Sequence, residues 1–206
     1  MDLKKIDQRL RGRRPRPMGI ESLFSVMITL IPIEGEWHLI FERRANSLRS
    51  QPNEVSLPGG HIDKGETPRQ TAKRECMEEL RLEEDQVEVL YELDYVVSRK
   101  NQVVHCFLGQ VKDREIYTIR PNPDEVSYIF TVPLSYFMEN EPRQYSLTYK
   151  SQYSEDFPYE LIPGGEDYPF REGKETIHFY IYEDRVIWGL TAKMVYAFTQ
   201  ILKGKA

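Results

Sequence analysis

Residues 58–82 read PGGHIDKGETPRQTAKRECMEELRL, a glycine-containing turn followed by a stretch with helical character. Thr67 is a favourable N-cap, because its hydroxyl can accept a hydrogen bond from a backbone N–H of the first helical turn. Pro68 suits the first helical position, since its missing N–H has no partner to lose there, and Gln70 completes the capping-box spacing. The sequence therefore predicts a helix over residues 68–80. Apolar residues spaced four apart would form its buried stripe: Ala72, Cys76 and Leu80.

Three carboxylates lie on a neighbouring face of this helix, at Glu75, Glu78 and Glu79. Like charges three and four residues apart repel by about 0.2–0.5 kcal/mol per pair. We therefore expect a cation to compensate the charge of these carboxylates. Mg²⁺ prefers oxygen ligands and usually takes one or two protein carboxylates together with water and substrate phosphates. Arg74 is spaced to pair with Glu78 one turn later. A solvated acidic helix face is the alternative, and the glycine turn, the N-cap and the carboxylates together favour a metal site.

The sequence on either side of this segment is typical of β-strands. Apolar residues alternate over residues 24–31 and again over 37–41, and residues 34–36 would close these two strands into a hairpin. The other elements that we expect are a second strand pair at 87–97 and 103–111 and a closing helix at 191–202. The predicted fold class is therefore α+β.

Length and composition predict one folded domain, since the chain has 206 residues, of which 40% are hydrophobic and 30% charged. We divide it into a basic N-terminal segment, residues 1–20, and a single domain, residues 21–206, with an insertion near 138–176 and a C-terminal helix. The net charge of −5 is uneven, because residues 1–16 hold seven Lys or Arg against two Asp. The acidic remainder argues against nucleic-acid binding.

Cysteine content and hydropathy bear on location and partners. No apolar run is long enough to span a membrane, and no secretion signal is evident. Two cysteines are too few for a disulfide framework, so we expect a cytoplasmic protein. We expect no nucleic-acid partner and no membrane partner, and a homodimer is left open.

The segment from Gly60 to Leu82 resembles the box of the Nudix family, written G-x5-E-x7-R-E-U-x-E-E-x-G-U, where U is a bulky apolar residue. The residues that match this box in register are Gly60, Glu66, Arg74, Glu75, Cys76, Glu78, Glu79 and Leu82. Arg81 stands where the family has glycine. Glycine after a helix supplies a left-handed C-cap, so arginine would cost about 1 kcal/mol if the same backbone were kept.

This resemblance implies an α/β/α sandwich with a mixed β-sheet and a metal-binding loop-helix-loop. It implies an enzyme that hydrolyses a phosphoanhydride bond with Mg²⁺ or Mn²⁺, and whose expected partner is a nucleotide-type small molecule. Glu75 and Glu79 would be the chief metal ligands, the Gly60 carbonyl would complete the site, and Glu78 would be a further ligand or the group that activates water. Arg74 would hold Glu75 or Glu78, so the implied catalytic residues are Glu78, Glu75 and Arg74.

Residues 43–60 and 187–192 resemble the coenzyme A diphosphatases of the same family. This resemblance implies hydrolysis of coenzyme A or its derivatives to 3′,5′-adenosine bisphosphate and 4′-phosphopantetheine. Substrate phosphates could be held by the planar guanidinium groups of Arg44, Arg43 and Arg49, which lie near the glycine turn in sequence. Solvated surface arginines are the other interpretation. The segment departs from the subfamily pattern at Ala45, Gln51, Asn53 and Leu57.

Other functions and roles stay open at this point. One is hydrolysis of a different nucleoside diphosphate linked to X, such as ADP-ribose or NADH. Another is a non-catalytic, nucleotide-sensing Nudix module. Glu125, in the loop Pro121–Val126, is an alternative base to Glu78, and a turn-capping role is the other interpretation of it.

Overall fold

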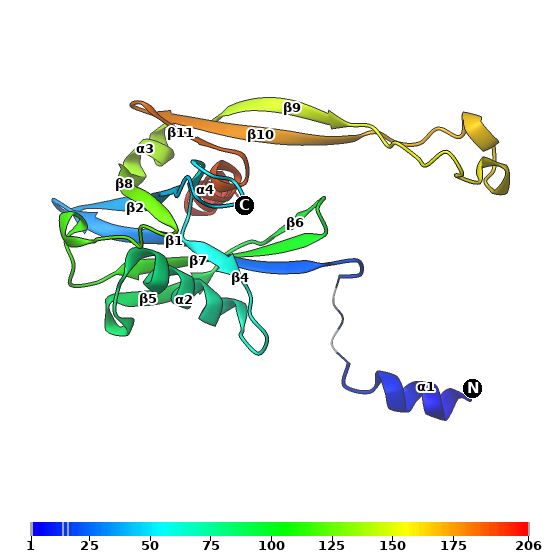
Figure 1. The fold of residues 1–206 in the computed structure, drawn as a ribbon, viewed down its shortest axis with the longest axis horizontal. Coiled ribbons are helices and arrows are strands. Elements are labelled where there is room, and N and C mark those ends of the chain that lie inside the picture. The colour runs from blue at the N-terminus through cyan, green and yellow to red at the C-terminus, as the bar shows by residue number, and fades with distance from the viewer. Residues whose placement is uncertain (1, 14, 16, 206) are drawn as a thin grey trace.

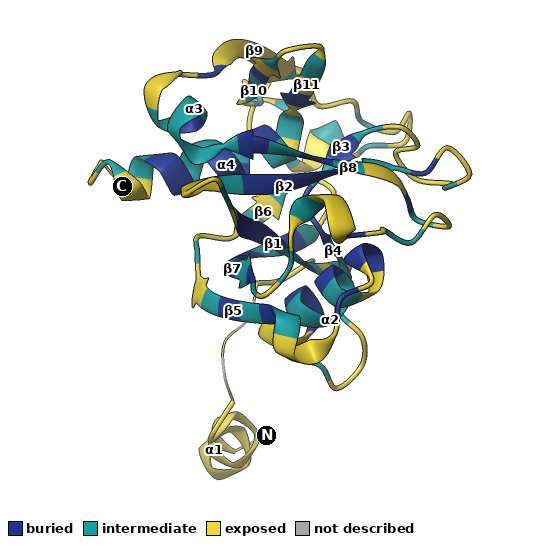
Figure 2. Cartoon of the chain, turned by 90° about the vertical axis from the view of Figure 1, so that its left-hand side faces the viewer, coloured by how far each residue is buried: buried dark blue, intermediate teal, exposed yellow. Residues whose placement is uncertain are grey.

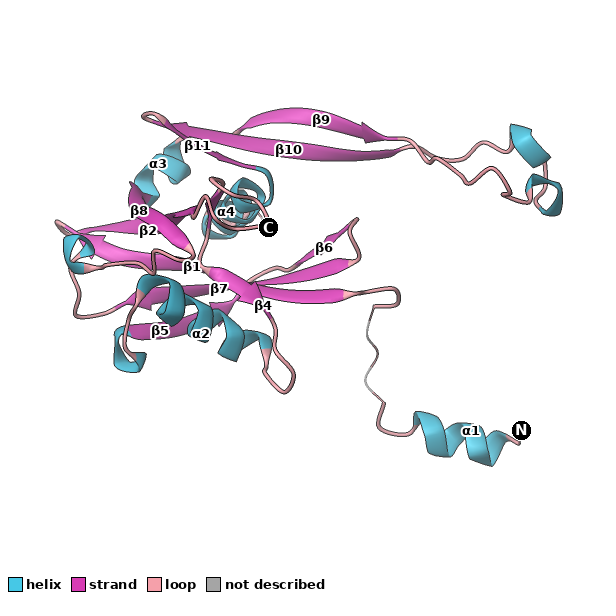
Figure 3. Cartoon of the chain, in the orientation of Figure 1, coloured by secondary structure: helices cyan, strands magenta, loops and turns pink. Residues whose placement is uncertain are grey.

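The computed structural model describes residues 2–13, 15 and 17–205, so Arg14 and Arg16 of the basic segment lie outside the described residues. The helices and strands, drawn in Figure 3, are α1 (Leu3–Leu10), β1 (Ser22–Ile33), β2 (Glu36–Arg44), β3 (Val55–Ser56), β4 (Gly59–His61), α2 (Pro68–Leu80), β5 (Val87–Glu92), β6 (Val96–Ser98), β7 (Gln102–Val111), β8 (Val126–Pro133), α3 (Leu134–Glu139), β9 (Arg143–Tyr149), β10 (Gly173–Tyr182), β11 (Arg185–Trp188) and α4 (Gly189–Leu202). Short 3₁₀ turns lie at Glu84–Gln86, Ile116–Thr118, Tyr159–Leu161 and Gly165–Asp167.

The central sheet is mixed and is built around β1. Its backbone order is β3-β2-β1-β7-β5, and β4, β6 and β8 pair with β1, β7 and β2. β1 runs antiparallel to β2 and parallel to β7. The predicted β1–β2 hairpin is confirmed. The second predicted pair is confirmed with a break, because β5 and β6 each pair with β7 while residues 93–95 between them belong to neither strand.

Helices cover both faces of this sheet (Figure 1), which confirms the α+β class and the α/β/α arrangement. On one face α2 packs over buried residues such as Met27 and Ile40. On the other face α3 and α4 pack over residues such as Leu39 and Phe41. Neighbouring residues of β2 point to opposite faces, so each face of the central strands is apolar. Figure 2 shows the resulting buried centre.

The ends of α2 follow the local sequence. Thr67 and Gln70 form the predicted capping box, with Pro68 at the first helical position. Arg81 adopts the left-handed conformation, with φ 52° and ψ 53°, and its N–H donates to the Met77 carbonyl. The backbone that glycine usually supplies is therefore kept although the residue is arginine, which is a conformation that costs free energy for a side chain with a Cβ.

Residues 138–176, expected as an insertion without regular periodicity, contain a strand that the sequence did not reveal. β9 pairs with β10, and β10 pairs with β11, in a separate three-stranded sheet. The β9–β10 hairpin projects from the body of the protein and ends in the segment 150–172, which we call the tip (Figure 1). Aromatic side chains of the tip pack on one another: Tyr153, Phe157, Tyr159, Tyr168 and Phe170.

The basic N-terminal segment carries α1, whose described residues are all exposed. Asp2 caps this helix by accepting a hydrogen bond from the Lys5 N–H. Among the described residues, no helix is long and apolar enough to cross a membrane. Both cysteines, Cys76 and Cys106, are buried as free thiols.

Candidate active site

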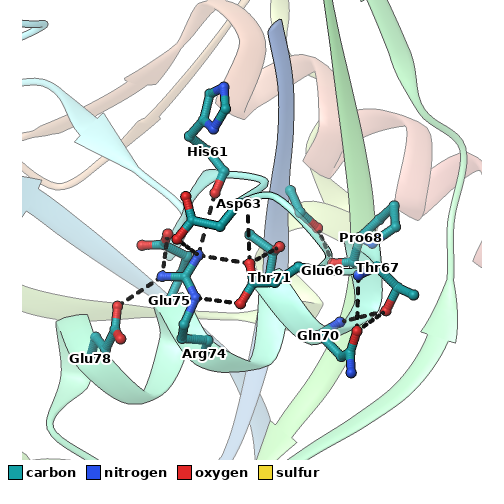
Figure 4. Close-up of polar contacts among 11 residues, drawn as sticks. His61, Asp63, Glu66, Thr67, Pro68, Gln70, Thr71, Arg74, Glu75 and Glu78 are labelled. Carbon is teal, nitrogen blue, oxygen red and sulfur yellow. Dashed lines mark hydrogen bonds and ion pairs between the residues drawn. The ribbon is translucent and has the colours of Figure 1, made fainter.

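Arg74, midway along α2, is the centre of a polar network that joins the helix to the loop before it (Figure 4). Its Nε and Nη2 donate to the Glu66 carboxylate at 2.8 and 3.1 Å. Its Nη1 lies 2.7 Å from Glu75 and 2.9 Å from Glu78, so the predicted Arg74–Glu78 pair is present and Glu75 shares the same donor. Three carboxylates are thus oriented by one guanidinium group, which is the geometry that planar arginine donors favour.

Glu66 has a role here that we did not assign from the sequence. In addition to the hydrogen bonds from Arg74, Glu66 accepts one from the Thr71 hydroxyl at 2.6 Å and one from the Asp63 N–H at 3.3 Å. Hydrogen bonds from Arg74 and then Thr71 lower the pKa of Glu66 to about 2, and Glu66 in turn raises the pKa of Arg74. Glu66 therefore fixes Arg74 while remaining ionised. The signal for this role was its place in the box, eight residues before the arginine.

Glu75 lies directly against the glycine loop. A Cβ built on Gly60 would come within 2.4 Å of Glu75 Oε1, a distance that side chains do not adopt. Any other residue at position 60 would therefore displace the Glu75 carboxylate from the glycine loop. Burial raises the pKa of Glu75, and Arg74 opposes that shift.

Glu79 is one turn further along α2 and is almost fully buried, with 4% of its surface exposed. Its Oε2 accepts a hydrogen bond from the Gly59 N–H at 2.8 Å, which ties the helix to β4. Burial raises the pKa of Glu79 to about 8; the Gly59 hydrogen bond opposes this shift and the charge of Glu75 adds to it. The predicted ligands Glu75, Glu79 and Gly60 are thus brought together at one loop.

Glu42, on β2, is a site residue that we did not predict. It is 1% exposed, and no hydrogen-bond donor among the described residues reaches either of its carboxylate oxygens. Burial and then the neighbouring Glu79 raise its pKa well above the usual value. The signal in the sequence was a charged residue directly after Leu39-Ile40-Phe41, a run typical of a strand that is buried on both faces.

The other predicted residues differ in how close they lie to these carboxylates. The charges of Arg44 and Glu125 both act on Glu42 and Glu79, and the loop that carries Glu125 is joined to α2 by a hydrogen bond from the Asn122 N–H to the Glu79 carbonyl at 2.8 Å. The Arg44 guanidinium also lies 3.4 Å from the Ser50 carbonyl. Arg43 is half-buried on β2 and Arg49 is exposed, and within the described residues no hydrogen bond or ion pair joins either one to the carboxylates.

The donor set fits a hard divalent cation, since it consists of carboxylates around a glycine backbone, with an unpartnered buried carboxylate beside them. In the arrangement seen here, no three His, Cys, Asp or Glu side chains among the described residues are grouped to hold a metal ion. Arg74 instead lies between Glu75 and Glu78.

Comparison with known proteins gives consistent matches. Residues 23–151 match the NUDIX domain family. The chain is 27% identical over 199 residues to "Nudix hydrolase 3" of Caenorhabditis elegans, which covers 94% of this chain and 80% of that protein. It is 36% identical over 135 residues to "Peroxisomal coenzyme A diphosphatase NUDT7" of Mus musculus, covering 65% and 56%. This chain spans about half the length of several curated relatives that it matches.

Among solved structures, a MutT/nudix family protein from Enterococcus faecalis aligns with a TM-score of 0.51 at 13% identity. The alignment covers 98% of this chain and 70% of that one. At this identity the similarity concerns the fold, and it extends beyond the segment that carries the carboxylates.

Proposed function

This chain belongs to the Nudix hydrolase family and is a diphosphohydrolase, and from that premise we propose that coenzyme A or a derivative of it is the substrate, with Mg²⁺ or Mn²⁺ as the cofactor. The products would be 3′,5′-adenosine bisphosphate and 4′-phosphopantetheine. The observation that carries the chemistry is the convergence of Glu75 and Glu79 on the glycine loop, where Gly60 leaves room for one carboxylate and the Gly59 N–H holds the other.

In this proposal, Glu75, Glu79 and the Gly60 carbonyl hold the cation, and Glu78 is either a further ligand or the group that takes a proton from water. The cation supplies charge neutralisation at the diphosphate and makes water easier to deprotonate. Glu78 is exposed and has one oxygen, Oε2, on Arg74, which leaves Oε1 to accept a proton. Arg74 keeps the carboxylates oriented through contacts that need no cation.

Glu125 is the alternative proton acceptor. It lies on the loop before β8, and its charge acts on Glu75 as well as on Glu79. Because it comes from a loop rather than from α2, it approaches the carboxylates from a different side of the site. Glu125→Gln and Glu78→Gln would distinguish the two bases, since only removal of the base changes the pH dependence of kcat.

Two considerations support coenzyme A as the substrate. The mouse relative described above is named as a coenzyme A diphosphatase. Arg44, one of the arginines expected to hold phosphate, lies near the carboxylates, so a ligand bound there would have a cationic group beside its diphosphate or its 3′-phosphate. Arg43 and Arg49 remain further candidates for the same contact.

The alternatives make different predictions. A hydrolase of another nucleoside diphosphate linked to X would prefer ADP-ribose or NADH over coenzyme A. A non-catalytic module would bind a nucleotide without cleaving it, and the complete carboxylate set argues against that function. The cytoplasmic location and the homodimer both remain predictions; the mouse relative is named as peroxisomal.

The test is a substrate panel of coenzyme A, acyl-coenzyme A, dephospho-coenzyme A, ADP-ribose and NADH, with Mg²⁺ or Mn²⁺ and with the products identified by mass. Arg44→Ala should raise KM for coenzyme A about tenfold or more and should change KM for dephospho-coenzyme A much less, because only the former carries a 3′-phosphate. Arg171→Ala, the same change on the exposed tip, is the control. Equal losses on both substrates would remove Arg44 from this role, and preference for ADP-ribose or NADH would remove the substrate assignment.

A further inference from the structure

The position of Glu42 follows from the place of β2 in the sheet. β2 pairs with β1 and then β3 along one edge and with β8 along the other, and both of its faces are covered. Ile40 packs in the core under α2, whereas Phe41 packs in the core under α4. Because side chains alternate along a strand, Glu42 points to the same face as Ile40, toward α2. A charged side chain is thus placed in the interior between the sheet and the helix.

Glu42 faces the active site, where the charge of Arg44 acts on it but no hydrogen bond from Arg44 reaches its carboxylate. Burial and then the Glu79 carboxyl raise the pKa of Glu42, while the charge of Arg44 lowers it. Neither of its oxygens receives a hydrogen bond within the described part of the chain. A buried carboxyl group that is not paired, hydrogen-bonded or joined to a cation loses its charge by taking up a proton, and a cation bound beside it would displace that proton.

We propose that Glu42 is a fourth carboxylate of the metal centre, placed by β2 beside Glu79 so that its charge contributes to binding of the divalent cation. This inference rests on the proposed function. The proposed metal centre would then contain carboxylates from two elements. Glu75, Glu78 and Glu79 lie on α2, and Glu42 lies on β2 in the sheet beneath it. A cation next to Glu79 would relieve the mutual repulsion of two buried carboxylates and would supply Glu42 with a counter-charge.

A purely structural role for Glu42 predicts something different. If the side chain only fills space between β2 and α2, then glutamine, which has nearly the same volume and can donate its amide to Glu79, should leave cation binding unchanged. A metal-centre role predicts weaker binding without loss of the fold. Direct measurement of cation affinity separates the two explanations independently of catalytic rate.

The experiment measures Mn²⁺ affinity of the full chain by electron paramagnetic resonance, for the wild type, Glu42→Gln, Glu42→Asp and Glu36→Gln. Glu36 is at the opposite end of β2, about 20 Å from Glu42 along the strand, so Glu36→Gln makes the same chemical change on the same strand outside the site. We expect Glu42→Gln to weaken Mn²⁺ binding at least tenfold, Glu42→Asp to weaken it less, and Glu36→Gln to match the wild type.

Thermal unfolding of the same proteins provides a second readout. Without metal, Glu42→Gln should be at least as stable as the wild type, because it removes an unpartnered buried carboxylate. With Mn²⁺ added, it should gain less in Tm than the wild type, since the gain depends on affinity. If Glu42→Gln does not fold, Glu42→Asp carries the same comparison against the wild type.

Unchanged Mn²⁺ affinity in Glu42→Gln would overturn this inference while leaving the proposed function intact, provided that the wild type binds Mn²⁺ and hydrolyses a diphosphate. A wild type that neither binds Mn²⁺ nor hydrolyses any diphosphate in the panel would overturn both. The same loss of affinity in Glu36→Gln as in Glu42→Gln would also contradict a specific role for Glu42.

Discussion

Two regions differ in where their side-chain contacts are made: the loop and helix at residues 58–82, and the β9–β10 hairpin. In the first region each functional side chain is tied to a neighbour close in sequence or to the glycine loop, as Glu66, Arg74 and Glu79 illustrate. In the second, strands far from the site pair across a long loop, and the aromatic tip packs on itself. The first region has the contacts expected of a catalytic centre. The hairpin packs on the body through β10, as Tyr180 shows, and no hydrogen bond or ion pair among the described residues joins its tip to that centre.

This difference indicates which part of the molecule tolerates few amino-acid substitutions. Substitution of Gly60 would place a side chain into the Glu75 carboxylate, and loss of Glu66 would release Arg74. The tip, by contrast, is joined to the body through β9 and β10 alone in Figure 1. Substitutions in the two regions should therefore differ strongly in their effect on catalysis.

The largest effect is expected at the helix carboxylates. Glu79→Gln and Glu75→Gln should each lower kcat about a hundredfold or more, an effect on the order of 3 kcal/mol in transition-state stabilisation, because each removes a charge from the cation site. Steady-state kinetics with Mg²⁺ or Mn²⁺ measures this change, and circular dichroism checks the fold. Tyr159→Phe, a conservative change in the tip, is the control. Near wild-type rates for both glutamine variants would remove the metal assignment.

A smaller effect is expected at the C-terminus of α2. Arg81→Gly should raise the free energy of unfolding by about 1 kcal/mol, because glycine adopts the left-handed conformation seen at this position without the steric cost of a Cβ. Lys73→Gly, within the same helix, should lower it by about the same amount. Urea denaturation measures both. A destabilised Arg81→Gly protein would mean that the Arg81–Asn122 hydrogen bond outweighs the backbone conformation.

The smallest effect on catalysis is expected from the tip. Replacing residues 150–172 with Asn-Gly would join Tyr149 to Gly173, which are partners in the hairpin, through a two-residue turn. We expect kcat for coenzyme A to stay within about twofold of the wild type, since a change of that size corresponds to less than about 0.5 kcal/mol. A large loss of kcat in a folded, shortened protein would show that the comparison between the two regions is wrong.

The sequence predicted the elements whose signals are local. Three predicted features depend on residues that are close in sequence, and all three are present. They are the capping box of α2, the β1–β2 hairpin and the apolar stripe of the helix. β9 was missed although Tyr145, Leu147 and Tyr149 alternate with polar residues, because this short alternation lies in a segment rich in Glu, Pro, Tyr and Gly, and the strand itself is mostly exposed. Its structure depends on pairing with β10, more than twenty residues later.

The same distinction applies to the site. The positions of Glu75, Glu78 and Glu79 on one helix could be predicted from spacing alone. Glu42 could not, because its importance depends on the packing of β2 beneath α2, which brings together residues 37 positions apart. Arg44 and Glu125 reach the same cluster from two further segments. Contacts between residues so far apart in sequence depend on the order of the strands in the sheet. A short sequence motif does not contain that information.

The central claim is that diphosphate hydrolysis here depends on a divalent cation held by the carboxylates of α2. Its most direct test is the rate of hydrolysis of the full panel of diphosphate substrates by protein that has been stripped with EDTA and dialysed, measured while Mg²⁺ or Mn²⁺ is titrated back. The expected result is no turnover without metal, and activity that rises and saturates with the cation. Full turnover of any of these substrates in excess EDTA would contradict the claim.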